Sequence, residues 1–359
     1  MRDNERIVSP RSPVILKGVP CSGGSGLGDE GAVVSRDDFG ALAEPHRREL
    51  QLHCYRMLGS LQDAEDLVQE TLLRAWKKLD TLTRKGSFRA WLYRIATNAC
   101  LDELDRRLPR TLPQARGPDS GETVPPLEPI LEPIWLEPYP DELVAGLETS
   151  PEARYDLLES TTLAFLRVLH VLTPRQRAIL ILRDVLDWRA DEVSQALEIT
   201  VSAVTSALHR ARKALAKHYS ARDRHSSRVE PDSEATRSLL DQYVRAWEYA
   251  DVDALISLLK RDATFAMPPS PSWYRVRSAI RAVVSAVVLA GKAEGRWKMK
   301  STRANSLPAL AWYQQDETTS TYRAFGIQVL TIEDNLLSDI TTFFNPALVR
   351  LFGFPEELG

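Results

Sequence analysis

Cysteine is scarce in this sequence, and its few cysteines lie far apart. Cys21, Cys54 and Cys100 are the three present among 359 residues, and no C-x-x-C pair occurs. An odd number of widely spaced thiols argues against a disulfide scaffold or a thiolate zinc site, and it fits a reducing cytoplasm. We therefore expect a cytoplasmic protein with no metal and no cofactor.

Long apolar runs and an excess of positive charge are also lacking. No segment reaches the roughly 20 apolar residues of a membrane helix, and charges and prolines interrupt the N-terminus where a signal peptide would need an apolar core. The formal net charge is −3, so any nucleic-acid binding must come from local basic patches. With 43% hydrophobic and 26% charged residues, the composition is that of a globular protein of two or three domains.

Changes in composition divide the chain into six segments. Residues 1–36 combine Ser-Pro pairs with a Gly/Ser-rich run, which predicts a disordered tail. Residues 108–153 contain ten prolines, nine acidic and two basic residues; this predicts an extended acidic linker with an apolar knot at 134–136 and Tyr139. The remaining segments are helical at 37–107 and 154–218, a polar linker at 219–233, and mixed at 234–359.

The last segment changes from helical to strand periodicity. One amphipathic helical stretch, Leu239–Leu259, precedes several alternating segments. Helices followed by a sheet predict a separate α+β domain. The expected strands are Ala263–Met267, Trp297–Thr302, Ala309–Tyr313, Tyr322–Thr331 and Leu337–Phe344.

The sharpest local pattern is a helix-turn-helix. A short helix near Ala190–Leu197, a three-residue break and a longer helix from Val201 to about Lys217 predict it. The break contains no glycine, so Glu198 must accept a strained conformation if the turn needs a positive φ. The second helix is expected to bury Val204, Leu208, Ala211 and Leu215. Its outward face, which would suit the major groove of DNA or equally the solvated face of an ordinary bundle, carries Ser202, Thr205, Ser206, His209, Arg210 and Lys213.

Two further helical patterns lie nearer the N-terminus. The first, with Asp63 as its expected N-cap, repeats apolar residues at a 3.6-residue period. Its apolar positions are Ala64, Leu67, Val68, Leu72, Ala75 and Trp76, and its polar face shows Asp66, Gln69, Glu70 and Arg74. The second, within 86–107, sets arginines beside Phe88, Trp91 and Tyr93, a combination suited to single-stranded DNA, although Trp91 fits a core position better.

These segments resemble the extracytoplasmic-function group of the sigma-70 superfamily. DAEDLVQET and FRAWLYRIATN resemble sigma region 2, and LTPRQRAILILRDVLDW with VTSALHRARKAL resembles region 4. The resemblance implies two all-α domains that bind core RNA polymerase and promoter DNA. It implies a polymerase contact at Asp66, Gln69, Glu70 and Arg74. It implies −10 contacts at Arg84, Lys85, Arg89, Arg94 and Asn98, and −35 contacts at the outward residues of the second helix of the helix-turn-helix.

The C-terminal segment resembles the SnoaL-like group, a cone-shaped α+β fold. YVRAWEYADVDALISLLKRDATFAMPPSPSWYR, TRAN at 302–305 and ITTFFNPALVRLFGFP carry the resemblance. A sigma-G-like subgroup that carries such a fused domain also has the linker motif found here at Trp135–Asp141. One departure is Val276, where that subgroup commonly has glycine. The expected pocket for a small apolar ligand comprises Trp247, Phe265, Trp273, Tyr274, Arg303 and Trp312.

Three functions compete at this point. The first is a sigma factor regulated by its third domain. The second is an enzyme, but residues 234–359 contain no histidine and show no evident carboxylate pair for acid–base work, so we expect no catalysis. The third is a helix-turn-helix regulator with a ligand-binding domain, which leaves the 63–98 block unexplained. The sequence does not reveal the promoter, the regulon, the activating signal or an anti-sigma factor.

Overall fold

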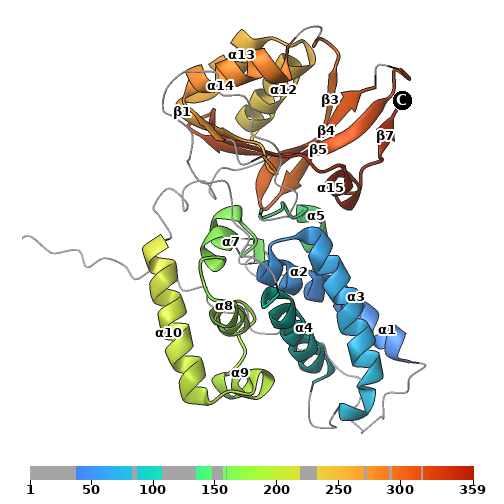
Figure 1. Ribbon diagram of the computed structural model, residues 1–359, viewed down its shortest axis with the longest axis vertical. Coiled ribbons are helices and arrows are strands. Elements are labelled where there is room, and N and C mark those ends of the chain that lie inside the picture. The colour runs from blue at the N-terminus through green and yellow to red at the C-terminus, as the bar shows by residue number, and fades with distance from the viewer. Residues whose placement is uncertain are drawn as a thin grey trace, which may run out of the picture.

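The computed structural model describes residues 38–82, 87–106, 135–147, 157–158, 160–218, 233–270, 273–290, 293–316 and 318–359. Two helical bundles lie side by side, and a sheet-containing domain sits across one end of both (Figure 1). None of the helices in these ranges is long and apolar enough to cross a bilayer.

The first bundle, here called the N-terminal bundle, is built from α1 to α4. Its helices are α1 (Phe39–Ala43), α2 (Arg47–Leu58), α3 (Leu61–Lys77) and α4 (Phe88–Leu104), with short 3₁₀ turns at Glu44–His46 and Leu79–Thr81. The expected N-cap at Asp63 is wrong by one turn: the Ser60 side chain accepts the Asp63 N–H, and α3 begins at Leu61. Ser60 is the better cap because its backbone is extended and its hydroxyl accepts the otherwise unpaired N–H of the third helical residue, Asp63.

The second bundle, here called the central bundle, contains the predicted helix-turn-helix. It comprises α7 (Leu163–Leu169), α8 (Pro174–Leu180), a π-helical extension η3 (Ile181–Val185), α9 (Ala190–Leu197) and α10 (Val201–His218). Thr173 and Gln176 form a capping box at the start of α8, with proline at the first helical position. Glu198 adopts a left-handed conformation with φ 55°, which confirms that the turn forces a non-glycine residue into a strained region.

The C-terminal domain is α+β, as predicted. Its sheet has the strand order β2-β1-β6-β5-β4-β3, with β7 added on β5 and one parallel pair, β1 with β6. The strands are β1 (Leu259–Ala266), β2 (Trp273–Arg275), β3 (Trp297–Ala304), β4 (Leu307–Gln315), β5 (Tyr322–Glu333), β6 (Leu336–Phe343) and β7 (Glu357–Leu358). The helices are α12 (Glu234–Glu248), α13 (Val252–Ser257), α14 (Arg277–Val283) with η4 (Val284–Val288), and α15 (Pro346–Leu351).

Two residues with positive φ interrupt this domain's helical patterns. The single expected helix over 239–259 is two helices, because Ala250 turns the chain at φ 54° between α12 and α13. Val276, which precedes α14, has φ 67°. A β-branched residue in this region is strained, and this gives a physical reason for the glycine found there in the resembling subgroup.

The sheet is buried on both faces. Leu310 and Trp312 of β4 face α12–α14, whereas Ala309, Ala311 and Tyr313 belong to the core that includes the helical bundles. This explains why the first seven residues of β4 are apolar without alternation. On the outer face α15 buries Leu348 and Val349, which belong to the core that also includes the helical bundles.

Candidate nucleic-acid interface and interdomain junction

The outward face of α10 is exposed to solvent. Ser202, Thr205, Ser206, His209, Arg210 and Lys213 are all exposed, while Val204, Leu208 and Ala211 are buried and Leu215 is half-buried. The neighbouring Arg212 is held by both oxygens of Asp184, at 2.9 and 2.7 Å, so it fastens α10 to η3. The face therefore presents one arginine, one lysine and several hydroxyls in a geometry that fits a major groove.

The polar face of α3 is likewise exposed. Asp66, Gln69 and Glu70 face solvent. Arg74 is half-buried, because it bonds Glu70 at 2.7 Å and Asp102 of α4 at 3.0 Å. We infer that Arg74 braces α3 against α4 while the other three residues are available to a partner.

Two exposed apolar residues lie on the same face of α3. Trp76, expected in the core, is 44% exposed, and Leu73 is 54% exposed. Leu73 and Trp76 follow Asp66 by seven and ten residues and Gln69 by four and seven residues, which places the four on one helical face. Counting these spacings instead of hydrophobicity alone would have found them. Exposed aromatic and aliphatic groups beside charges are typical of a protein-binding surface.

Of the residues of α4 expected to contact DNA, two are exposed and one is bonded within the N-terminal bundle. Arg94 and Asn98 are exposed, whereas Arg89 donates to Glu49 of α2 at 2.8 Å and lies over the Tyr93 ring. Burial opposes the charged form of Glu49, but hydrogen bonds from His46 and Arg89 outweigh it and lower its pKa. Trp91 is buried, as expected, and Arg84 and Lys85 lie outside the described residues.

A tight turn of the C-terminal domain enters the space between the two bundles. Asn305, between β3 and β4, is fully buried. Its amide nitrogen donates to the Tyr55 hydroxyl at 3.0 Å and to the Thr161 carbonyl at 2.6 Å. Its Oδ1 accepts the Tyr139 N–H at 2.8 Å, and the Asn305 N–H returns a bond to the Tyr139 carbonyl at 3.0 Å. One side chain thus joins the N-terminal bundle, the linker and the central bundle.

Residues 135–147 of the linker form hydrogen bonds with both the N-terminal bundle and the C-terminal domain. Glu137 caps α3 by accepting from Ser60 and from the Leu61 N–H, both at 2.9 Å, and the Trp135 indole donates to the Pro269 carbonyl. Arg303, expected in a ligand pocket, instead donates to Asp141 at 3.2 Å. Arg303 therefore joins β3 to the linker, and its expected place in a ligand pocket stays a prediction.

The two bundles also contact one another directly. The Tyr93 ring of α4 lies 6.1 Å from that of Trp188. Gly59, at the end of α2 with φ 74°, approaches so closely that a β-carbon there would lie 2.3 Å from Leu136 and 2.7 Å from His170. Only glycine fits this position.

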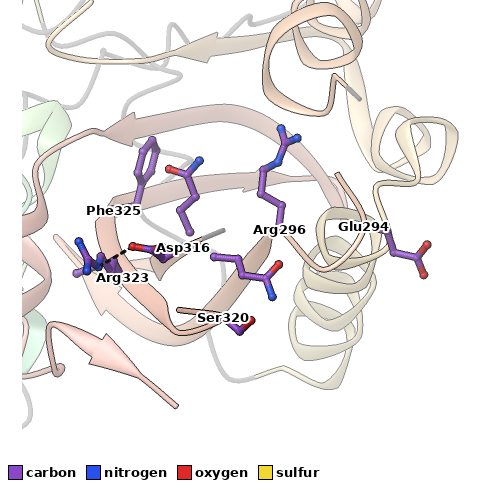
Figure 2. Close-up of a pocket in the computed structure, with 9 residues that line it drawn as sticks. Glu294, Arg296, Asp316, Ser320, Arg323 and Phe325 are labelled. Carbon is purple, nitrogen blue, oxygen red and sulfur yellow. Dashed lines mark ion pairs between the residues drawn. The ribbon is translucent and has the colours of Figure 1, made fainter. Parts of the chain in front are cut away.

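The other expected pocket residues are buried or half-buried, and none of them is among the residues that line the cavity described below. Trp247, Phe265 and Trp312 are core, Tyr274 is 8% exposed and Trp273 is half-buried. A cavity of about 790 Å³ lies at the opposite end of β3 and β4 from Asn305. It is lined by Glu294, Arg296, Gln314, Gln315, Asp316, Ser320, Arg323, Ala324 and Phe325. Figure 2 shows Arg323 paired with Asp316 near Phe325, while the Glu294 carboxylate is directed away from them.

Comparisons with known proteins are consistent across sequence and structure. Residues 42–108 match Sigma-70 region 2, and residues 162–215 match Sigma-70, region 4. The ECF RNA polymerase sigma factor SigG of Mycobacterium tuberculosis (strain ATCC 25618 / H37Rv) is 42% identical over 332 residues, covering 92% of this chain and 88% of that protein. SigJ of the same strain is 30% identical over 241 residues, 67% of each. The crystal structure of M. tuberculosis extracytoplasmic function sigma factor SigJ matches with a TM-score of 0.53 at 23% identity, covering 88% of this chain and 99% of that one, and thus has the same fold.

Proposed function

Because the chain belongs to the ECF RNA polymerase sigma factors, we propose that it binds core RNA polymerase through α3 and reads promoter DNA through α4 and α10. The observation that carries this proposal is the exposure of all six outward residues of α10. In this proposal the N-terminal bundle acts as region 2 and the central bundle as region 4. Asp66, Gln69 and Glu70 contact polymerase, with Leu73 and Trp76 as apolar anchors beside them.

The two DNA contacts differ in kind. Arg94 and Asn98 on α4 would meet the −10 element, with Arg84 and Lys85 from the preceding segment. Arg210, Lys213 and the hydroxyl groups of α10 would meet the −35 element, since arginine reads guanine and hydroxyls reach bases or phosphates in a major groove. Arg89 and Arg74 support these surfaces through their ion pairs.

The C-terminal domain is proposed to regulate the two bundles. Its β3–β4 turn bonds both of them and the linker. A sigma factor must present regions 2 and 4 to separate promoter elements, so a contact that holds the bundles together restrains it. Withdrawal of the turn would then raise the fraction of molecules able to bind polymerase, a shift that needs only a few kcal/mol between the two states.

The acidic linker is proposed to do more than connect the bundles. Residues 108–153 carry nine acidic against two basic residues, a charge that repels DNA and suits the basic nucleic-acid cleft of a polymerase. If so, replacing residues 114–134 by an equally long Gly/Ser segment impairs initiation more than promoter binding. Normal yields of abortive and full-length RNA would identify a plain spacer.

Small-molecule binding, if the C-terminal domain has it, is proposed for the cavity at Arg296 and Phe325. Mostly polar side chains line that cavity, which favours a polar ligand over the apolar one expected from sequence. We propose no catalysis, because this domain lacks histidine and, of the two carboxylates that line its cavity, Asp316 is held in an ion pair with Arg323 while Glu294 is directed away from it. We further propose that the chain acts in the cytoplasm, where core polymerase and DNA are found.

The deciding experiment is assembly of the purified full chain with core RNA polymerase. Co-purification, followed by transcription from a promoter library in vitro, tests both contacts at once. A chain that binds promoter DNA but not polymerase would instead be a helix-turn-helix regulator.

A further inference from the structure

Two arginines are buried where the N-terminal and central bundles meet. Arg56 of α2 is 1% exposed and Arg177 of α8 is 2% exposed. Arg56 donates to the Ser160 hydroxyl. Arg177 donates to the Met57 carbonyl across the contact and to the Leu169 carbonyl at 3.1 Å within its own bundle.

Neither guanidinium has a carboxylate partner among the described residues. Their hydrogen-bond partners there are backbone carbonyls, a hydroxyl and the His170 ring. The Arg56 Nε atom is buried with no acceptor. Desolvation lowers the pKa of Arg56 to about 10 and that of Arg177 to about 10. A buried cation without an anion is unfavourable, and exposure to water relieves it.

A second set of contacts joins the same two bundles one residue away. Arg56 pairs with Ser160, and the adjacent residues Tyr55 and Thr161 are both bonded to Asn305. The Ser306 hydroxyl adds a bond to the Leu158 carbonyl at 3.3 Å. Neutral hydrogen bonds of this kind carry no charge-burial penalty. The unfavourable bridge and the favourable bridge therefore lie side by side, one belonging to the bundles and the other to the C-terminal domain.

We propose that the contact between the bundles is a metastable latch, in which buried Arg56 and Arg177 favour separation and the docked Asn305 turn keeps it closed. The inference rests on the proposed function, in which separation makes the chain competent for polymerase. It explains how undocking of the Asn305 turn can open the whole contact. Without the hydrogen bonds of that turn, the contact between the bundles still buries two desolvated cations, which favour separation. Arg56 is a positioning residue in this arrangement, since it acts through Ser160 and touches no substrate.

The latch predicts that removing a buried charge makes the closed form more stable. Arg56→Met in the full chain keeps the side-chain volume and removes the charge. Replacing a buried ion by an apolar group of similar volume is often stabilising, so we expect the separated fraction to fall about fivefold. Arg56→Lys, which keeps a positive charge, is the matched control and should not lower that fraction. Ser160→Ala removes the acceptor of Arg56 and should raise it.

The readout is the distance between the bundles in solution. Single-molecule fluorescence energy transfer between dyes on non-natural amino acids at Glu65 and Arg175, both exposed, reports it without using the native cysteines. Circular dichroism verifies that each variant folds. An equal or larger separated fraction in Arg56→Met than in wild type overturns the proposal, as does no change in Ser160→Ala.

Polymerase titration of the same variants separates this inference from the function on which it rests. If the distances shift as expected and affinity for core polymerase follows them, both stand. If the distances shift and affinity does not change, the latch stands and its role in polymerase binding fails.

Discussion

The side-chain amide of Asn305 donates to the hydroxyl of Tyr55 at 3.0 Å across 250 residues of sequence. The backbone of Asn305 has φ 54°, a conformation that asparagine tolerates better than most residues because its short polar side chain bonds locally. One residue therefore both makes the β3–β4 turn and contacts α2. The turn cannot change without changing the contact.

Asn305→Gly should loosen the junction while leaving the turn intact. Glycine accepts the positive φ, but bonds to Tyr55, Thr161 and the Tyr139 N–H are lost, a cost of about 2–4 kcal/mol with partners left buried. We expect faster hydrogen exchange in β3–β4 and tighter binding to core polymerase. Asn335→Gly, in an exposed turn at φ 59°, is the control. Unaltered exchange at the junction would mean that Asn305 does not hold it.

Gly59→Ala should lower the free energy of unfolding by crowding the contact of α2 with the linker and the central bundle. Its β-carbon would approach Leu136 and His170 to 2.3 and 2.7 Å, and its φ of 74° adds backbone strain. Gly146→Ala shares the positive φ, 86°, but meets nothing within 4 Å. Chemical denaturation should therefore show a loss of about 3 kcal/mol for Gly59→Ala and about 1 kcal/mol for Gly146→Ala. Equal losses would show that strain, not crowding, matters at Gly59.

Glu70→Lys should weaken holoenzyme assembly. Glu70 is exposed on the α3 face that carries Asp66 and Leu73, and the change also breaks its ion pair with Arg74. We expect about tenfold weaker binding to core polymerase, since charges at interface rims direct partner choice. Glu65 is exposed on another side of α3. Glu65→Lys changes the net charge by the same amount as Glu70→Lys and should bind core polymerase normally. Equal affinity of the Glu70 variant and wild type would remove this face from the interface.

Arg210→Ala should weaken transcription from promoters that depend on the −35 element. The side chain is exposed on α10 and available for a bidentate base contact, which contributes about 1–3 kcal/mol. In vitro transcription and DNA titration at fixed salt measure the loss. Arg175→Ala, exposed on α8, removes the same charge away from α10. Indistinguishable transcription by the Arg210 variant and wild type would show that the reading face lies elsewhere.

The N-terminal bundle should lose stability as pH falls from 7 to 5. Thr97 donates to the Tyr93 carbonyl, so it accepts from His53 and a proton lies on His53 Nε2. Burial, with a smaller contribution from Arg56, lowers the pKa of His53 from 6.5 to about 3. The unfolded chain takes up the proton near pH 6.5 while the folded one does not, so stability present above that pH is lost below it. We expect a loss of about 2 kcal/mol by pH 5. His53→Asn should show a smaller pH dependence in urea titrations; an unchanged dependence would assign it to other groups.

Local periodicity was enough to predict most elements and the two outward faces. The strands of the C-terminal domain, the capped start of α8 and the strained Glu198 turn follow from side-chain spacing and backbone sterics, which depend on neighbours in the chain. The same reasoning misplaced the N-cap of α3, placed Trp76 in the core and joined α12 to α13. Trp76 was misplaced because its apolar side chain is exposed rather than part of the helix's own core, and the helices were joined because Ala250 adopts an uncommon φ.

The sequence by itself determined the family, the helical bundles, the α+β domain and the exposed α10 face, because motif, spacing and capping act over a few residues. Only the tertiary structure decided what joins them. Arg303 bonds Asp141 of the linker, Asn305 bonds three segments, and Arg56 and Arg177 are buried at one contact. These relationships depend on partners more than one hundred residues away, whose desolvation and hydrogen bonds exist only after the domains have packed.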